Sequence, residues 1–212
     1  MTGPAIWAAA MLLATKATAL CFCPQCVLPS FQSFEAASTS MLPAFAPGAC
    51  FVAERWEADT PLPPRGTIIV FRHPRTDADH IFRLIGLPGD EVQMRNGRLW
   101  LNGEEVAQSA LPDLTYDTSQ DPTFLCPAAA PGTTTCEIEQ AMETLPGGAN
   151  YPVLNLRDGP LDHTDDLTVP EGHVFVLGDN RDNAADSRLP AHSGGPGMIP
   201  VGNIWGVVSS DS

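Results

Sequence analysis

Two serines stand two residues apart in the string Ser38-Thr39-Ser40-Met41-Leu42-Pro43. A seryl hydroxyl is a weak nucleophile at neutral pH and needs a neighbouring base before it can attack a carbonyl carbon. A second hydroxyl close by can donate a hydrogen bond to the oxyanion that such an attack creates. On its own the string is equally typical of a turn, because serine is common at turns. Ser40 is therefore a candidate nucleophile only in the company of other groups.

Three further segments carry charged and small residues in unusual patterns. They are Arg65–Arg72 (RGTIIVFR), Asp79–Asp90 (DHIFRLIGLPGD) and Gly178–Arg188 (GDNRDNAADSR). The first two contain apolar runs that predict strands. The third could be a charged turn after a buried strand, but its length and composition exceed what turn chemistry requires.

In this order, and behind an apolar N-terminal segment, the four segments resemble the bacterial type I signal peptidases. These are membrane-bound serine proteases that cut signal peptides from exported proteins. The resemblance covers residues 29–208 and implies a serine endopeptidase of the signal peptidase I type. It implies that Ser40 is the nucleophile and that Ser38 supplies a hydroxyl to the oxyanion hole.

The resemblance also implies ionic support for the site from Arg83 paired with Asp179, and from Asp186 paired with Arg188. The sequence departs from the family at the residue that acts as general base. Phe82 stands where the family carries its lysine, and a phenyl ring cannot accept a proton. The chain has one lysine, Lys16, and it lies in the N-terminal segment.

Ala184 stands where the family carries the serine that orients this lysine. Without the lysine, a buried hydroxyl at that position would lack a partner, which costs free energy. Phe82 and Ala184 therefore form a consistent apolar replacement. We expect the base and its orienting group to have been lost together.

His80 is the candidate substitute base. It comes two residues before Phe82, so on a strand it shares the same face at about 6 to 7 Å along the chain. The alternative is that His80 is a polar strand residue at the rim of the site. The other four histidines have no motif context and are expected at the surface or in loops: His73, His163, His173 and His192.

Substrates of the family bind as an added β-strand, and small side chains enter two shallow apolar pockets, which gives an Ala-x-Ala preference. Matched to this sequence, the pocket walls are Phe34, Ala36, Met41 and Ile81, although ordinary core packing would also explain these four. The implied partners are signal peptides of exported preproteins. The resemblance implies no cofactor and no metal.

Two functions remain open. The first is a signal-peptidase-like endopeptidase at the bacterial inner membrane, with its body on the extracytoplasmic side. The second is a catalytically inactive relative that binds peptides or partners at the membrane. Loss of a catalytic group of this kind costs about 10⁴- to 10⁶-fold in turnover, which favours the second function. Retention of both serines favours the first.

Composition limits the fold and the partners. The 212 residues include 11 basic and 25 acidic side chains, and the net charge of -14 argues against nucleic-acid partners. Short apolar runs separated by 21 prolines and 18 glycines predict a mainly β fold. We expect coiled antiparallel sheets forming a partly closed barrel-like core from residues 29–100 and 160–212. Residues 101–159 are expected to form a smaller inserted lobe, with 113–150 as an excursion between strands.

Residues 1–28 contain an apolar stretch that predicts an N-terminal helix. The stretch Ala5–Phe22 is interrupted by Lys16 and is shorter than the roughly 20 apolar residues of a membrane span. A membrane anchor, a cleaved export segment and a helix lying on the membrane remain open, and each would place the body near or across a membrane. The oligomeric state is not indicated.

Six cysteines form two groups. Cys126 and Cys136 bracket a loop rich in proline, glycine and threonine, and we expect a disulfide there, with two free thiols as the alternative in a reducing compartment. Cys21, Cys23 and Cys26 are crowded at the end of the apolar segment. Their spacing suggests metal only weakly, because a fourth ligand is missing nearby.

Overall fold

The computed structural model describes residue 21, residues 23–121, residues 124 and 126, and residues 132–209. Strands and loops make up this part of the chain, and its helices are short 3₁₀ turns. The predicted N-terminal helix falls on residues 1–20 and 22, which lie outside the described residues. No helix in the described part is long and apolar enough to cross a membrane.

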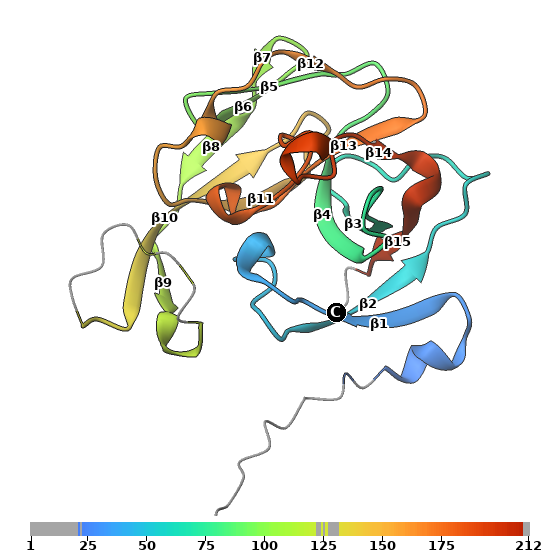
Figure 1. Cartoon of the computed structure of the whole chain (residues 1–212), viewed down its shortest axis with the longest axis horizontal. Helices are drawn as coiled ribbons and strands as arrows, with labels where there is room; N and C mark the ends of the chain where they lie inside the picture. Colours follow the sequence, from blue (N-terminus) through green and yellow to red (C-terminus); the bar gives the residue numbers. More distant parts are fainter. Residues whose placement is uncertain (1–20, 22, 122–123, 125, 127–131, 210–212) are drawn as a thin grey trace, which may run out of the picture.

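Seven strands form the main sheet, and each neighbouring pair is antiparallel. Figure 1 shows the sheet curling from β1 and β2 at the bottom towards β13 and β14 above them. The mainly β class with a curled antiparallel sheet is therefore confirmed. In spatial order the strands are β1 (Phe31–Glu35), β2 (Cys50–Arg55), β15 (Ile204–Val208), β3 (Ile68–Arg72), β4 (Asp79–Gly86), β13 (His173–Leu177) and β14 (Ile199–Pro200).

The centre of this sheet is covered on both faces. Successive side chains of a strand point to opposite faces, and in β3 Ile69, Val70 and Phe71 are all fully buried. Ile69 and Phe71 pack into one apolar cluster with residues of β4 and β13, whereas Val70 packs into a second cluster with residues of β2. This explains why β3 is a continuous apolar run rather than an alternating one.

The remaining strands lie between residues 91 and 168 and form two smaller sheets. One has the order β12 (Leu167–Thr168), β5 (Glu91–Arg95), β6 (Arg98–Leu101) and β7 (Glu104–Glu105). In the other, β10 (Thr135–Thr144) lies between β11 (Asn150–Asn155) and β8 (Ala107–Ala110), and also pairs with β9 (Leu114–Asp117). The excursion expected at 113–150 therefore contains strands of its own, and the β9–β10 pair projects from the body in Figure 1.

The 3₁₀ turns connect these strands. They are η1 (Pro24–Val27), η2 (Thr39–Met41), η3 (Thr118–Gln120), η4 (Pro160–Asp162), η5 (Arg181–Asn183), η6 (Ala191–Ser193) and η7 (Val201–Asn203). Two of them matter for function, because η2 carries Ser40 and η5 contacts η2.

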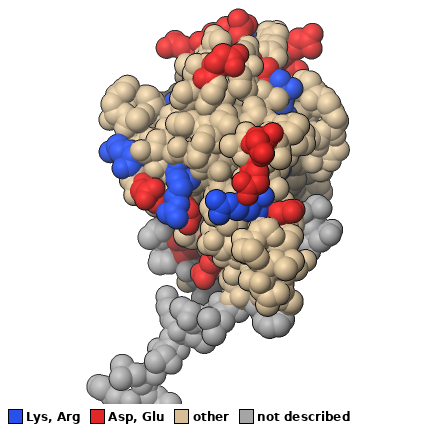
Figure 2. Space-filling model, turned by 90° about the vertical axis from the view of Figure 1, so that its right-hand side faces the viewer, with Lys and Arg blue, Asp and Glu red and all other residues tan. Residues whose placement is uncertain are grey.

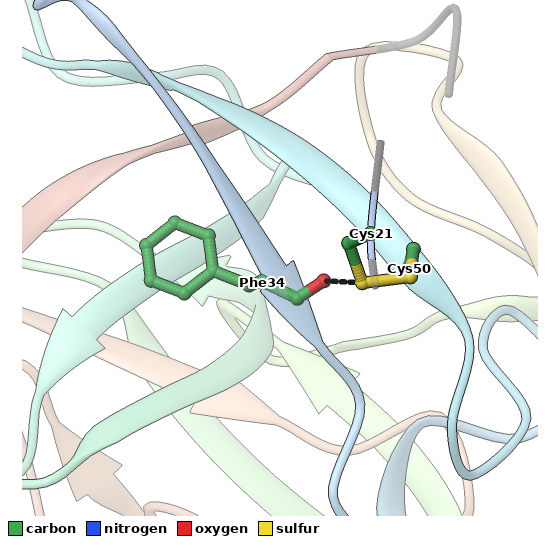
Figure 3. Close-up of a disulfide and its surroundings, with 3 residues drawn as sticks. All are labelled: Cys21, Phe34 and Cys50. Atoms are coloured by element: carbon green, nitrogen blue, oxygen red, sulfur yellow. Dashed lines mark hydrogen bonds between the residues drawn. A yellow bond between two sulfur atoms is a disulfide. The ribbon is translucent and has the colours of Figure 1, made fainter. Parts of the chain in front are cut away.

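All six cysteines are paired in three disulfides. Cys126 bonds to Cys136, and Cys23 bonds to Cys26. Cys21 bonds to Cys50 at the start of β2, and its Sγ lies 3.7 Å from the carbonyl oxygen of Phe34 in β1 (Figure 3). The sulfurs of the N-terminal group are therefore not free thiolates for a metal, and the pairing is typical of an oxidising compartment.

Charged side chains do not form one continuous patch on the face in Figure 2. Basic groups stand next to acidic groups there, and much of that face is uncharged. Elsewhere among the described residues, partly exposed basic and acidic side chains also pair, as Arg72 does with Asp79 and Arg98 with Glu105. The excess negative charge therefore does not mark a binding surface on this face.

The Cys126–Cys136 disulfide should contribute more stability than Cys23–Cys26, because it closes a longer loop. The sequence separations are 10 and 3. Replacing Cys126 and Cys136 by serine should lower the free energy of unfolding by about 2.5 to 3 kcal/mol. Denaturant titration of this variant measures the loss, and the Cys23→Ser, Cys26→Ser variant is the matched control. An equal or larger loss in the control would contradict the loop-length argument.

Candidate active site

Ser38 and Ser40 meet in the turn η2. Ser38 is the N-cap residue, and its side-chain oxygen accepts a hydrogen bond from the backbone N–H of Ser40 at 3.4 Å. Its hydroxyl also donates to Ser40 Oγ at 3.0 Å. The two groups that the sequence assigns to the nucleophile and the oxyanion hole are thus in direct contact. Ser40 is half-buried and Ser38 is exposed.

Residues of the Gly178–Arg188 string hold this turn in place. The backbone N–H of Asn180 donates to the carbonyl oxygen of Ser40 at 3.1 Å, and its side-chain amide donates to the carbonyl oxygen of Thr39 at 3.1 Å. The amide of Asn183 donates to the hydroxyl of Thr39. Sequence reasoning did not single out Thr39, Asn180 or Asn183, although the density of amides in the string was a usable signal.

Phe82 and Ala184 fill the space beside the nucleophile. Both are buried and belong to the same apolar cluster as Met41. Gly178 lies where they meet. A Cβ added to Gly178 would be 2.3 Å from Ala184 Cβ, 2.7 Å from the carbonyl oxygen of Ser40 and 3.3 Å from Phe82 Cε1. Phe82 and Ala184 are therefore neighbours that lie close to the backbone of Ser40.

Two buried ion pairs hold the Gly178–Arg188 string. Arg83 binds Asp179 through two hydrogen bonds of 2.8 and 2.6 Å, and Arg188 binds Asp186 through two of 2.8 Å. Burial raises the pKa of the Asp179 carboxyl, and the Arg83 guanidinium opposes this change. Asp186 also accepts from the backbone N–H of Gly178 at 3.1 Å, which ties the ion pair to the wall of the site.

A third buried ion pair was not anticipated from the sequence. Arg181 in the string binds Glu143 of β10, and the hydroxyl of Tyr151 donates to Glu143 at 2.9 Å. Burial opposes ionisation of Glu143, but the charge and hydrogen bonds of Arg181 lower its pKa. This pair joins the string to the smaller sheet that contains β10. A single glutamate within a mixed run of residues offers no local signal for such a contact.

A cavity of about 160 Å³ opens beside the two serines. Ala36, Met41 and Ile81, three of the four predicted pocket residues, line it. Phe34 does not line it, because its ring packs against Phe51 and Trp205, at 5.7 and 5.2 Å between ring centroids. The full lining is Glu35, Ala36, Ala37, Ser38, Ser40, Met41, Asp79, His80, Ile81 and Phe82.

His80 lines this cavity together with Ser40, but no hydrogen bond joins the two among the described residues. Burial and the neighbouring His73 lower the pKa of His80 below its ordinary 6.5, against the opposing charge of Asp79. The lowered pKa favours the neutral form of His80, which has a lone pair to accept a proton. His73 was expected at the surface or in a loop; it lies in the loop between β3 and β4 but not at the surface. Only 4% of this residue is exposed, because the connection between β3 and β4 folds over it.

Comparison with known proteins matches this arrangement to a family. The model of the family described as "Signal peptidase, peptidase S26" matches residues 7–210. This chain belongs to that family. A signal peptidase I of Rickettsia bellii (strain OSU 85-389) is 34% identical over 150 residues, which are 67% of this chain and 45% of that protein.

The signal peptidase I of Rickettsia canadensis (strain McKiel) is also 34% identical over 150 residues, covering 67% of this chain and 49% of that protein. The chain thus spans about half the length of the curated relatives it matches. The crystal structure of a signal peptidase I from Enterococcus faecalis V583 aligns with a TM-score of 0.40 and 26% identity, over 71% of this chain and 100% of that one. No group of three or more potential metal ligands is assembled within the described residues.

Gly178→Ala should destabilise the protein by about 1 to 3 kcal/mol, because the added methyl group overlaps Ala184 and the backbone of Ser40. Gly202→Ala is the matched control, since a Cβ there meets nothing within 4 Å. Denaturant unfolding of the two variants measures the difference. Equal stability would mean that the string and the Ser40 turn are not closely packed.

Proposed function

We propose that this protein is a signal-peptidase-like serine endopeptidase in which His80 replaces the missing lysine as general base. The observation that carries the proposal is the shared cavity: Ser38, Ser40 and His80 all line it. The membership in the signal peptidase family supports the type of reaction. A neutral imidazole beside the nucleophile supports the choice of base.

The reaction would proceed in two stages. Ser40 Oγ transfers its proton to His80 and attacks the carbonyl carbon of the scissile peptide bond. The resulting oxyanion accepts hydrogen bonds from the backbone N–H of Ser40 and the hydroxyl of Ser38, both of which must turn away from their present partners. Protonated His80 then gives its proton to the leaving nitrogen, and the C–N bond breaks. In the second stage, His80 takes a proton from water, whose oxygen attacks the acyl carbon. The ester bond to Ser40 Oγ then breaks, and His80 returns the proton to Ser40.

The substrate would be the signal peptide of an exported preprotein, bound as an extended strand beside the cavity. Ala36, Met41 and Ile81 leave room for small apolar side chains, which supports an Ala-x-Ala preference. The disulfides support a body on the extracytoplasmic side of the bacterial inner membrane. The apolar segment before residue 23 would hold the body at the lipid, as an anchor or a helix on its surface.

A second function is favoured by one specific observation. Phe82 is part of the core at the position of the family's lysine, with 3% of its surface exposed. A site closed in this way could still bind a peptide strand without cutting it. The alternative function is therefore a non-catalytic peptide- or partner-binding protein at the membrane.

Cleavage of an Ala-x-Ala peptide by the full chain separates the two functions. Ser40→Ala should abolish cleavage, and His80→Gln should lower kcat about 10²- to 10⁴-fold. Because the neutral form of His80 is the base and its pKa lies below 6.5, the rate should rise with pH up to about that point and then level off. His192→Gln, at an exposed site, is the matched control. Cleavage that survives Ser40→Ala would exclude the proposed mechanism.

The double variant Phe82→Lys, Ala184→Ser tests how much of the ancestral site remains. The two side chains adjoin Gly178 and Ser40, so the new ammonium and hydroxyl would lie together beside the nucleophile. We expect kcat to rise above that of the parent and to become independent of His80. A parent chain that is silent but binds the peptide, with a double variant that cuts it, would establish the binding function instead. The single Phe82→Lys variant controls for the loss of the ring.

A further inference from the structure

His73 and His80 lie side by side across the hairpin of β3 and β4. Phe71 stands opposite His80 in the register, and His73 follows Phe71 by two residues, so all three side chains share one face. The backbone N–H of His73 donates to the carbonyl oxygen of Ala78 at 2.8 Å, which continues the pairing beyond the strands. The two imidazole centroids are 4.8 Å apart.

The position of the proton on His73 is set by its backbone contacts. Its Nδ1 accepts hydrogen bonds from the backbone N–H groups of Arg75 at 3.2 Å and Thr76 at 3.3 Å. A protonated Nδ1 could not accept either bond, so the ring is neutral with its hydrogen on Nε2. Burial and the charge of Arg75 also lower the pKa of His73. The ring is thus a fixed, uncharged neighbour for His80.

The other neighbours of His80 among the described residues do not place an ionisable ring against it. The rings of Phe71 and Phe82 lie at 5.9 and 6.2 Å between centroids and carry no ionisable group. Asp79 precedes His80 on β4 and is bound to Arg72 at 3.1 Å. Glu35, at the end of β1, is the other acidic residue in the cavity wall. His73 is therefore the ionisable side chain whose ring packs directly on that of His80.

We propose that His73 is a positioning residue for His80, and that it holds the His80 ring in the cavity wall beside Ser40 in its proton-accepting form. The inference rests on the proposed role of His80 as the base. Packing between the two rings limits rotation of His80. Because the buried ring of His73 excludes water from one side of His80, a positive charge on His80 would be poorly solvated, and the imidazole resists protonation from solvent. His80 then takes its proton from Ser40 rather than holding one already.

His73→Asn provides the test. The asparagine oxygen retains an acceptor for the N–H groups of Arg75 and Thr76, while the ring beside His80 is lost. NMR titration should show the pKa of His80 moving up towards its ordinary value, because the smaller asparagine lets water reach that side of the His80 ring and burial is the main cause of its lowered pKa. In cleavage assays kcat should fall about 10- to 100-fold with KM nearly unchanged, and the acid limb should move to higher pH. His192→Asn is the matched control.

The titration and the cleavage assay separate this inference from the proposed function. An unchanged His80 titration in His73→Asn would overturn the pairing. A parent chain that cuts no peptide, but whose His80 titration moves in His73→Asn, would overturn the protease and leave the pairing standing. Should His73→Asn fail to fold, His73→Phe keeps a ring against His80 and removes its nitrogens. The His80 titration should stay near that of the parent in that variant, because a ring still covers His80, and a shift towards the ordinary value would overturn the pairing.

Discussion

The site depends on the hydrogen bonds that tie the Ser40 turn to the Gly178–Arg188 string. A 3₁₀ turn of three residues has little stability of its own. Asn180 and Asn183 bind the backbone and side chain of Thr39, and Asn180 also binds the carbonyl oxygen of Ser40. The string is in turn held by buried ion pairs, including Arg83 with Asp179. The position of the nucleophile is thus set by residues about 140 positions away in the chain.

Phe82 and Ala184 give the site an apolar wall without disturbing this framework. A lysine at position 82 would need its charge compensated or its proton removed, and burial would favour the neutral amine. Phe82 removes both requirements and packs with Ala184 against the same backbone. A buried phenyl ring does not carry the energetic cost of a buried base, and it cannot accept a proton. Under the proposed function, the proton acceptor is His80 in the cavity wall.

Local patterns predicted the fold class, because apolar periodicity is a property of neighbouring residues, whereas the roles of Ser38 and Ser40 came from the family resemblance. They also pointed to Cys126 and Cys136, since the loop between them is short. They missed β10, whose alternation of buried Cys136 and Ile138 with exposed glutamates is flanked by proline-rich chain. His73 was missed for a different reason. Its burial and its contact with His80 depend on the β3–β4 register, which no motif in the sequence encodes.

The Cys21–Cys50 disulfide is a second covalent link between the N-terminal segment and the body, in addition to the peptide chain between them. Val27 and Leu28, within that stretch, are strongly exposed, at 84% and 53%. A backbone break there would yield two chains that remain one covalent molecule until the sulfur bond is reduced. Attachment of the body to its N-terminal segment is therefore governed by the redox state of the surroundings as well as by the integrity of the backbone.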